Sequence, residues 1–247
     1  MTQNKTALII GANSDMGRAI ASQLAEEGYD LQLAARQAEE RLDRAATDLN
    51  LRFQRSVSKL ELDVCATDSH ADFVESLNPQ PDLVVSVAGL MTEQTGAQAD
   101  YSQAKAMIDA NFSGLVSLFE KLAAQMESRG SGCLVGVSSV AGDRGRQKNY
   151  IYGAAKAGFS TYLSGLRNRL ASKGVHVITV KPGFVNTAMT EGMDLPEKLT
   201  AEPEEVALHI SKAIEKQRNV IYSKPIWLLV MLIIKHIPEF IFKKLDL

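Results

Sequence analysis

Cysteine is scarce in this chain, and so is any excess of charge of one sign. Cys65 and Cys133 are the only cysteines among 247 residues, which excludes a disulfide framework and leaves no ligand spacing for a cysteine-bound metal. We interpret both as reduced thiols in the core of a cytosolic protein. The 27 basic and 29 acidic residues give a net charge of −2, without a lysine- or arginine-rich cluster. Nucleic acid is therefore not an expected partner.

Long hydrophobic runs are lacking as well. The first residues, MTQNKTALII, do not combine a basic start with a long apolar stretch, as a secretory signal does. An unbroken apolar run extends from Pro225 to Ile234, but a bilayer-spanning helix needs about 20 such residues, and Pro238 would interrupt a longer helix. We therefore expect a cytoplasmic protein.

What the sequence does contain is a regular alternation of strand-like and helix-like segments. Hydrophobic residues make up 45% of the chain, enough for a large core. Helical spacing of apolar residues, longest over 102–130, separates β-rich runs at 6–10, 30–35, 59–64, 82–88, 132–139, 175–182 and 219–223. This alternation predicts an α/β fold, a doubly wound parallel sheet of about seven strands with helices on both faces.

The glycines after the first predicted strand indicate a nucleotide-binding turn. Gly11 and Gly17 bracket the turn, which delivers the chain to a helix N-terminus whose free N–H groups suit a phosphate. Glycine spacing alone is a weak indication, because an ordinary strand-to-helix turn uses the same residues. The residues expected to contact the nucleotide here are Gly11, Asn13, Ser14, Asp15, Met16 and Gly17.

Asp15 is unexpected in such a turn, because a carboxylate repels a phosphate. Two interpretations are open. In one, Asp15 abolishes nucleotide binding and leaves the fold as a scaffold or regulator. In the other, its side chain caps the following helix, gains about 1 kcal/mol from backbone N–H groups and points away from the phosphates. We favour the second, because a decayed site would not retain the set of polar residues described next.

Three polar residues predict acid–base chemistry. Tyr152 and Lys156 lie four residues apart in a helical segment, so they share one face, and the ammonium would lower the pKa of the phenol from its usual value of about 10. A phenol tuned in this way can exchange a proton with a carbonyl or carbinol oxygen. Ser139 ends a strand-like run thirteen residues earlier, and its hydroxyl can hydrogen-bond the same oxygen. An isolated Tyr-x3-Lys is more often a surface pair, and the neighbouring Tyr150 lacks a lysine partner because position 154 is alanine.

Seven short motifs occur together in one order and spacing. They are Gly11-x5-Gly17, Asp63-Val64, Ser86-Val87-Ala88-Gly89, Asn111-x2-Gly114, Gly136-Val137-Ser138-Ser139-x-Ala141-Gly142, Tyr152-x3-Lys156 and Lys181-Pro182-Gly183-x4-Thr187. In this arrangement the chain resembles the short-chain dehydrogenase/reductase family from residue 5 to about 222. The resemblance implies a Rossmann-type fold and an enzyme that moves a hydride between a nicotinamide cofactor and a ketone.

The resemblance also implies catalytic roles. Ser139, Tyr152 and Lys156 match the family's catalytic serine, tyrosine and lysine. Asn111 would complete the set by holding a water that links Lys156 to solvent.

Cofactor contacts follow from the same resemblance. Asp63 and Val64 would flank the adenine ring, whereas Val185 and Thr187 would line the nicotinamide amide and the phosphates. The further positions implied in cofactor binding are Ala88, Gly89, Asn111, Tyr152, Lys156, Pro182 and Gly183.

The end of the second predicted strand bears on the choice of cofactor. An enzyme that prefers NAD would place an acidic residue there, but this chain has Ala35 followed by Arg36, which can pair with a ribose phosphate. We therefore expect NADP(H) rather than NAD(H). Against this, Ser14 stands where NADP-dependent relatives often have a second basic residue, and Arg36 could be an ordinary solvated loop residue.

A narrower resemblance concerns the glycine turn, the segments 139–146 and 148–158, and the tail at 230–245. These look like the reductases that act on decaprenylphosphoryl-keto-pentofuranose, a subgroup of the family. That resemblance implies a keto-sugar on a lipid phosphate carrier as substrate. Another keto substrate, such as a 3-oxoacyl thioester or a small ketone, and a non-enzymatic nucleotide-binding scaffold stay open.

Residues 1–224 are expected to form one domain, with residues 225–247 as an apolar C-terminal helical extension. The extension could pack over its own substrate cleft, enter an oligomer interface, or lie shallowly in a membrane surface with Trp227 at headgroup level. We expect a homodimer or homotetramer. The polar segment 186–200 is expected to be a mobile lid over the substrate.

Overall fold

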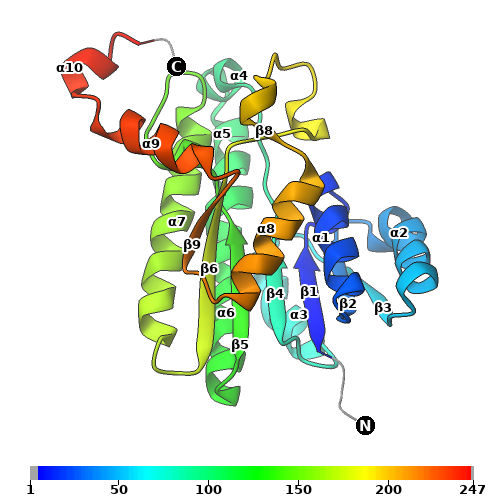
Figure 1. The fold of residues 1–247 in the computed structure, drawn as a ribbon. Coiled ribbons are helices and arrows are strands. Elements are labelled where there is room, and N and C mark those ends of the chain that lie inside the picture. Colours follow the sequence, from blue (N-terminus) through cyan, green and yellow to red (C-terminus); the bar gives the residue numbers. More distant parts are fainter. Residues whose placement is uncertain (1–4, 246–247) are drawn as a thin grey trace.

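Seven parallel strands form the central sheet of the computed structural model, which describes residues 5–245 (Figure 1). In sheet order they are β3 (Val57–Glu61), β2 (Asp30–Ala35), β1 (Thr6–Ile10), β4 (Leu83–Ser86), β5 (Gly132–Val137), β6 (Val175–Pro182) and β9 (Val220–Ser223). The inner strands are runs of aliphatic residues buried on both faces, as a parallel sheet covered by helices requires. The predicted α/β fold is thereby confirmed.

Helices cover both faces of this sheet. On one face lie α1 (Asp15–Glu26), α2 (Ala38–Phe53) and α8 (Pro203–Glu215), and on the other α3 (His70–Ser76), α6 (Gly114–Arg129) and α7 (Tyr150–Leu170). Each helix turns an apolar stripe to the strands. On the α6–α7 side, for example, Phe119 and Phe159 meet edge to face with ring centroids 5.5 Å apart. The molecule therefore has one hydrophobic core on each side of the sheet.

The strand order reverses between β1 and β4. From β1 the chain moves outward to β2 and β3, then returns to β4 on the other side and continues through β5 and β6 to β9. Loops at the carboxyl ends of β1 and β4 therefore run in opposite directions and leave a crevice between them. This edge of the sheet is where the predicted site residues fall.

The longest predicted helix is interrupted. Instead of one helix over 102–130, the chain forms α5 (Tyr101–Ile108), a π-helical turn (Asp109–Ser113) and then α6. Helical periodicity in the sequence does not reveal such a turn, because one extra residue hardly disturbs the apolar pattern. A short helix that we did not predict, α4 (Gln94–Ala99), precedes α5.

The predicted lid segment is bounded by a small second sheet. Its two short parallel strands are β7 (Phe184–Val185) and β8 (Thr200–Ala201). Short 3-10 helices at Ala188–Thr190 and Glu197–Leu199 lie between them. Both ends of the segment are thus fixed, while its movement over a substrate stays a prediction.

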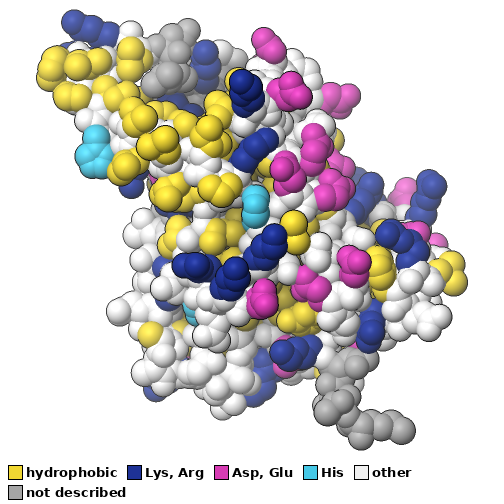
Figure 2. Space-filling model, viewed as in Figure 1, with side chains coloured by type: hydrophobic (Ala, Val, Ile, Leu, Met, Phe, Trp, Pro, Cys, Tyr) yellow, Lys and Arg dark blue, Asp and Glu magenta, His cyan; other side chains and the backbone are white. Residues whose placement is uncertain are grey.

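The C-terminal extension is helical, as predicted, and consists of α9 (Ile226–His236) and the short α10 (Glu239–Phe242). Trp227 and Met231 are buried against the domain, whereas most other apolar side chains of α9 are exposed. Figure 2 shows these hydrophobic side chains gathered over α9 and α10. Over residues 5–245, no helix combines the length and the apolarity needed to cross a bilayer.

The two cysteines differ in their surroundings. Cys133 on β5 is largely enclosed, and burial raises the pKa of its thiol to about 12. Cys65 is exposed in the turn after β3, so the expectation of two core thiols is wrong for Cys65. The apolar neighbours Leu62 and Val64 are buried or half-buried after the end of β3, but the turn that follows carries Cys65 to the surface.

Candidate active site

The glycine turn joins β1 to α1 at the carboxyl edge of the sheet. Gly11 has φ 85°, and a Cβ there would lie 2.9 Å from the backbone nitrogen of Ala88, so only glycine fits against the end of β4. Ser14 is the N-cap of α1. Its hydroxyl donates to the Gly11 carbonyl (2.8 Å) and accepts from the Gly17 N–H (3.1 Å). The N-terminus of α1 therefore opens into the crevice, where Asn13, Ser14, Asp15 and Met16 are partly exposed.

Asp15 does not cap α1, contrary to our expectation. Ser14 holds the cap position, and Asp15 is the first helical residue. Its carboxylate accepts a hydrogen bond from the backbone N–H of Ala188, with Oδ2 2.9 Å from the nitrogen. The side chain thus reaches across to Ala188, which begins the first 3-10 helix of the lid segment. Such a partner, 173 residues away, cannot be found from local sequence.

The ends of β2 and β3 carry the residues expected at the adenosine end of a nucleotide. Arg36 follows β2 and is exposed, and its charge acts on the nearby Cys65 thiol beside β3. Asp63 accepts from the Cys65 N–H with its Oδ1 (2.9 Å) and, like Val64, is partly exposed. Glu61, which the sequence analysis did not single out, binds the N–H groups of Gln37 and Ala38 at the start of α2.

Tyr152 lies in the first turn of α7, next to Ser139 at the end of β5. Ser139 caps a 3-10 helix (Val140–Gly142) by accepting from the Ala141 N–H at 3.1 Å. Burial raises the pKa of Tyr152 to about 12, and a hydrogen bond with the Ser139 side chain opposes that rise. The phenol is therefore protonated at neutral pH and can act as a proton donor.

Lys156 is buried one turn further along α7. Its Nζ donates to the Val137 carbonyl (3.1 Å) and lies 5.7 Å from the Tyr152 ring centroid. The expectation that Lys156 lowers the pKa of Tyr152 is wrong for this structure, because desolvation dominates at both groups. Burial also lowers the pKa of Lys156, to about 8.

Asn111 occupies the π-helical turn and is fully buried. Its Nδ2 donates to the carbonyls of Leu90 (2.6 Å) and Met107 (2.7 Å), and its Oδ1 accepts from the Leu90 N–H (3.4 Å). A Cβ at Gly89 would lie 2.6 Å from that Oδ1 and 3.3 Å from Lys156 Nζ. Asn111 and Lys156 therefore face the same point of the chain, directly after β4.

Ser138 supports this arrangement, although the sequence analysis gave it no role. Its buried hydroxyl donates to the Lys156 carbonyl (2.9 Å) and shares a hydrogen bond with Ser160 (2.7 Å). These bonds fix the turn of α7 that carries Lys156 against β5. In the sequence, this role was indicated only by the presence of a polar residue directly before Ser139, at the end of an apolar strand.

The turn after β6 faces the C-terminal helix. A Cβ at Gly183 would overlap the indole ring of Trp227, and that ring meets Phe184 edge to face with centroids 5.3 Å apart. Trp227 Nε1 donates to the Leu199 carbonyl at the end of the lid segment (2.9 Å). Trp227 thus connects the predicted nicotinamide turn with the lid, a role that its place in an apolar run did not reveal.

Charged residues after Ser139 also contact the end of the chain. Arg144 donates to the carbonyls of Ile234 (2.5 Å) and Ile237 (2.7 Å), pairs with Glu239 (2.9 Å) and lies 3.6 Å from the centroid of the Phe242 ring. These bonds satisfy carbonyls at the C-terminus of α9. The loop next to Ser139 and the C-terminal extension are therefore held together.

A second polar set lies beneath that loop. Asp143, whose side chain is almost fully buried, pairs with Lys181 (2.5 Å) and accepts from the Tyr222 hydroxyl (2.6 Å). The interaction ties the loop to β6 and β9. Lys181 belongs to a motif found from sequence, but its partner was not predicted.

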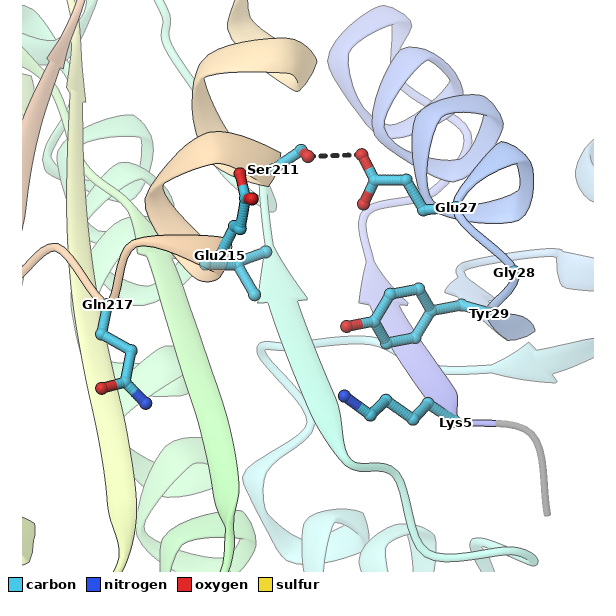
Figure 3. Close-up of a pocket in the computed structure, with 8 residues that line it drawn as sticks. Lys5, Glu27, Gly28, Tyr29, Ser211, Glu215 and Gln217 are labelled. Carbon is cyan, nitrogen blue, oxygen red and sulfur yellow. Dashed lines mark hydrogen bonds between the residues drawn. The ribbon is translucent and has the colours of Figure 1, made fainter. Parts of the chain in front are cut away.

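A groove of about 630 Å³ lies at the opposite edge of the sheet, near the start of β1 (Figure 3). Lys5 and Tyr29 point into it, and a hydrogen bond between Ser211 and Glu27 crosses its rim. The groove contains no predicted site residue. We therefore place the candidate site at the carboxyl edge.

The structure brings most of the predicted residues to this edge. Each of these residues lies next to another of the set in space. The glycine turn lies against Ala88, and Gly89 lies against Asn111 and Lys156. Ser139 and Tyr152 lie beside Lys156. Arg36, Asp63 and Val64 follow β2 and β3 on the adjoining part of the same edge, where the Val64 carbonyl lies against Gly114. A proton donor, a buried ammonium and a helix N-terminus with exposed backbone thus share one crevice.

Comparison with known proteins assigns the family. The sequence matches the family described as short chain dehydrogenase over residues 5–198. An uncharacterized oxidoreductase of Mycobacterium tuberculosis is 35% identical over 243 residues, covering 96% of each chain. An uncharacterized oxidoreductase of Myxococcus xanthus is 32% identical over 213 residues, covering 85% of this chain and 83% of the relative. Neither name specifies a substrate, so these relatives do not support the narrower resemblance to keto-pentofuranose reductases.

Solved structures share the fold. A short-chain dehydrogenase from Sphingobium yanoikuyae in complex with NADPH superposes with a TM-score of 0.81 at 24% identity, covering 95% of this chain and 97% of the other. A protein from Beutenbergia cavernae, described as a putative NAD(P)-dependent gluconate 5-dehydrogenase with NADP bound at low occupancy, gives 0.81 at 22% identity, covering 91% and 97%. Given the match along most of its length and the 35% identical mycobacterial relative, this protein belongs to the short-chain dehydrogenase family.

Proposed function

We propose that this protein is an NADPH-dependent oxidoreductase that reduces a ketone to a secondary alcohol. The observation that carries the proposal is the convergence of Ser139, Tyr152, Lys156 and Asn111 at the carboxyl edge, beside the open N-terminus of α1. A proton donor next to a nucleotide-binding turn is what carbonyl reduction requires.

The residues at the carboxyl edge suit a dinucleotide. The first turn of α1 presents backbone N–H groups to a pyrophosphate, and the absence of a side chain at Gly89 leaves the approach to Asn111 and Lys156 open. Asp63 and Val64 would hold the adenine, and the segment Pro182–Thr187 would hold the nicotinamide end. When bound, NADPH supplies the hydride.

The other steps of the reaction are assigned to side chains of the site. Tyr152, protonated because burial raises its pKa to about 12, gives its proton to the carbonyl oxygen as the alcohol forms. Ser139 orients that oxygen by a hydrogen bond. Lys156, with a pKa lowered to about 8, is mostly charged at neutral pH, would hold the nicotinamide ribose and would return a proton to Tyr152 through a water at Asn111.

NADP(H) is proposed over NAD(H) on two grounds. Arg36 is exposed at the end of β2, where a ribose phosphate would lie, and no acidic residue follows that strand directly. Two proteins with the same fold contain NADPH or NADP. Glu61 already binds the N-terminus of α2, so Arg36 would carry the recognition of the phosphate.

The substrate that we propose is a keto-sugar on a lipid phosphate carrier. In support, a buried apolar cluster of Val140, Phe184 and Trp227 adjoins Ser139 and Gly183, and the outer side of the helix that carries Trp227 is apolar and exposed, so an aliphatic chain could lie along that side. A 3-oxoacyl thioester or small ketone is the alternative within the same chemistry, and a panel of ketones assayed for NADPH oxidation separates these substrates.

The test of the reaction is Tyr152→Phe, with Tyr150→Phe as the matched control on the same helix. Loss of the proton donor should lower turnover about 10²–10⁴-fold while leaving NADPH binding unchanged. Tyr150 is bonded to Gln98 rather than to Ser139, so its variant should keep its activity. Comparable turnover in both variants would remove Tyr152 from the mechanism, and failure of the parent protein to bind NADPH would refute the proposed enzyme itself.

A further inference from the structure

The C-terminal extension presents a continuous hydrophobic surface to solvent. We call it the apolar face, and it consists of Ile226, Leu228, Leu229, Leu232 and Ile233 on α9 with Phe240, Ile241 and Leu245 on and after α10. Exposure reaches 59% for Ile233 and 66% for Phe240. Contiguous apolar surface of this kind is rare on soluble proteins unless it binds something.

The apolar face is held in place by the fold. The opposite side of α9 buries Trp227 and Met231 against Val140 and Phe184. At the far end, the guanidinium of Arg144 binds the last carbonyls of α9 and pairs with Glu239. One side of α9 packs on the domain and the other side is exposed, so the apolar face has a fixed position on the protein and is not a frayed chain end.

The residues at the edge of the apolar face carry positive charge, which favours an anionic partner. Between residues 225 and 245 the basic residues are Lys235, Lys243 and Lys244, together with His236, and all are exposed. Glu239 is the one acidic residue in that stretch, and Arg144 neutralises it. Figure 2 shows basic side chains and a histidine at the edge of the hydrophobic area, with acidic side chains gathered elsewhere. A protein with net charge −2 thus has a locally cationic apolar surface.

We propose that the apolar face of α9 and α10 binds an anionic lipid surface, with α9 lying in the plane of the interface. A helix whose exposed side is a row of leucine and isoleucine, with Lys235 in its last turn and Lys243 and Lys244 after α10, suits the boundary between headgroups and acyl chains. At 11 residues α9 is too short to span a bilayer but long enough to lie on one. A second copy of the chain fits less well, because a two-fold contact would bring the two sets of lysines together.

This surface goes beyond the proposed reduction and does not depend on it. It would, however, orient the molecule, because the inner side of α9 touches the residues directly after Ser139 and Gly183. The rim of the candidate site would then lie near the lipid.

The experiment is co-sedimentation of the full chain with phosphatidylcholine vesicles that do or do not contain phosphatidylglycerol. The parent protein should bind the anionic vesicles and be released by salt. Leu229→Asn with Ile233→Asn should weaken binding at least about tenfold, because two exposed aliphatic side chains leave the interface. Lys243→Glu with Lys244→Glu should weaken binding to anionic vesicles by about the same factor. The control is Leu51→Asn, at a leucine on α2 that is more exposed (72%) than Leu229 (58%), and this variant should bind like the parent.

Thermal unfolding of each variant, expected to match the parent, shows that the fold is intact. Absence of vesicle binding by the parent, or equal binding by the Leu229/Ile233 variant, would overturn the proposal. So would a dimer, seen by analytical ultracentrifugation, that the same variant dissociates while vesicles fail to bind, since the face would then be a contact between copies. NADPH binding is read separately by fluorescence, so loss of the enzyme function and loss of lipid binding are distinguishable.

Discussion

The carboxylate of Asp15 accepts a hydrogen bond from the backbone N–H of Ala188, with 2.9 Å between oxygen and nitrogen. This contact joins the start of α1 to the first 3-10 helix of the lid segment, so it bridges the crevice in which we place the cofactor phosphates. It also explains how a carboxylate is tolerated in the glycine turn. The charge is directed at a backbone donor on the far side of the crevice.

Two substitutions separate the bond from the charge. Asp15→Asn keeps an oxygen acceptor for Ala188 and removes the negative charge, so NADPH should bind several-fold more tightly at low salt. Asp15→Ala also loses the bond, which should cost about 1 kcal/mol of unfolding free energy and speed the dissociation of NADPH. Fluorescence titration and stopped-flow dissociation provide the readouts. If both variants release NADPH at the parent's rate, Asp15 does not hold the lid segment.

Lys156 should make the stability of the protein depend on pH in a defined window. Burial lowers its pKa from 10.5 to about 8, so between these values the folded state binds fewer protons than the unfolded state. The cost of the buried charge is fully present below pH 8 and disappears as the pH rises. Relative to Lys156→Met, the parent should therefore gain on the order of 2–3 kcal/mol of unfolding free energy between about pH 8 and about pH 10.

Urea unfolding of the parent and Lys156→Met at both pH values measures this difference, in which titrating groups away from Lys156 cancel but the adjacent Tyr152 does not. The pH range over which the two proteins are compared must end near pH 10. Above it the raised pKa of Tyr152, about 12, makes the folded state retain a proton that the unfolded state loses, and stability falls again. Parallel pH profiles for the two proteins would show that Lys156 is not buried as a charge.

The local pattern of apolar residues was sufficient to predict the strands of the sheet. It was not sufficient to predict contacts between residues that are distant in sequence. Strands β1, β2 and β6 have the predicted bounds, because each is a short aliphatic run between turn residues and both of its faces are buried. The motif spacing likewise placed Tyr152 beside Ser139. By contrast, the pKa of Tyr152 depends on desolvation by the whole fold, which residue spacing does not encode.

The same limit applies to Asp15, Trp227 and Arg144. Their partners Ala188, Leu199 and Ile234 are distant in sequence, and each contact involves a backbone group that has no sequence signature. The C-terminal run is apolar at every position from Pro225 to Ile234, so the sequence does not show which side packs, whereas the fold divides it into a buried and an exposed half.

Arg36 should determine the preference between the two nicotinamide cofactors. If its exposed guanidinium binds the ribose phosphate, Arg36→Ala should weaken NADPH about tenfold and leave NADH within about twofold. Arg52→Ala is the control, because Arg52 pairs with Asp48 at the far end of α2. Dissociation constants from cofactor fluorescence give the answer, and equal weakening of both cofactors would assign Arg36 a structural role.

Gly183 and Trp227 form the contact between the predicted nicotinamide turn and the C-terminal helix, and a double-mutant cycle can measure it. Because a Cβ at Gly183 would overlap the indole ring, Gly183→Ala should cost about 1–3 kcal/mol, and Trp227→Ala about 3–5 kcal/mol. In the double variant the added methyl enters the space that the indole leaves. Its total cost should therefore fall short of the sum by at least about 1 kcal/mol.

The control cycle replaces Gly183→Ala with Gly165→Ala. A Cβ at Gly165, on α7, meets nothing within 4 Å, so this change should stabilise the helix by about 0.5–1 kcal/mol and add to Trp227→Ala without coupling. Urea unfolding followed by far-UV circular dichroism suits all the variants, since Trp227 is the sole tryptophan and its loss removes the fluorescence signal. Additive costs in the Gly183 cycle would mean that the turn and α9 are energetically independent, and the C-terminal extension would then have no mechanical connection to the site through this contact.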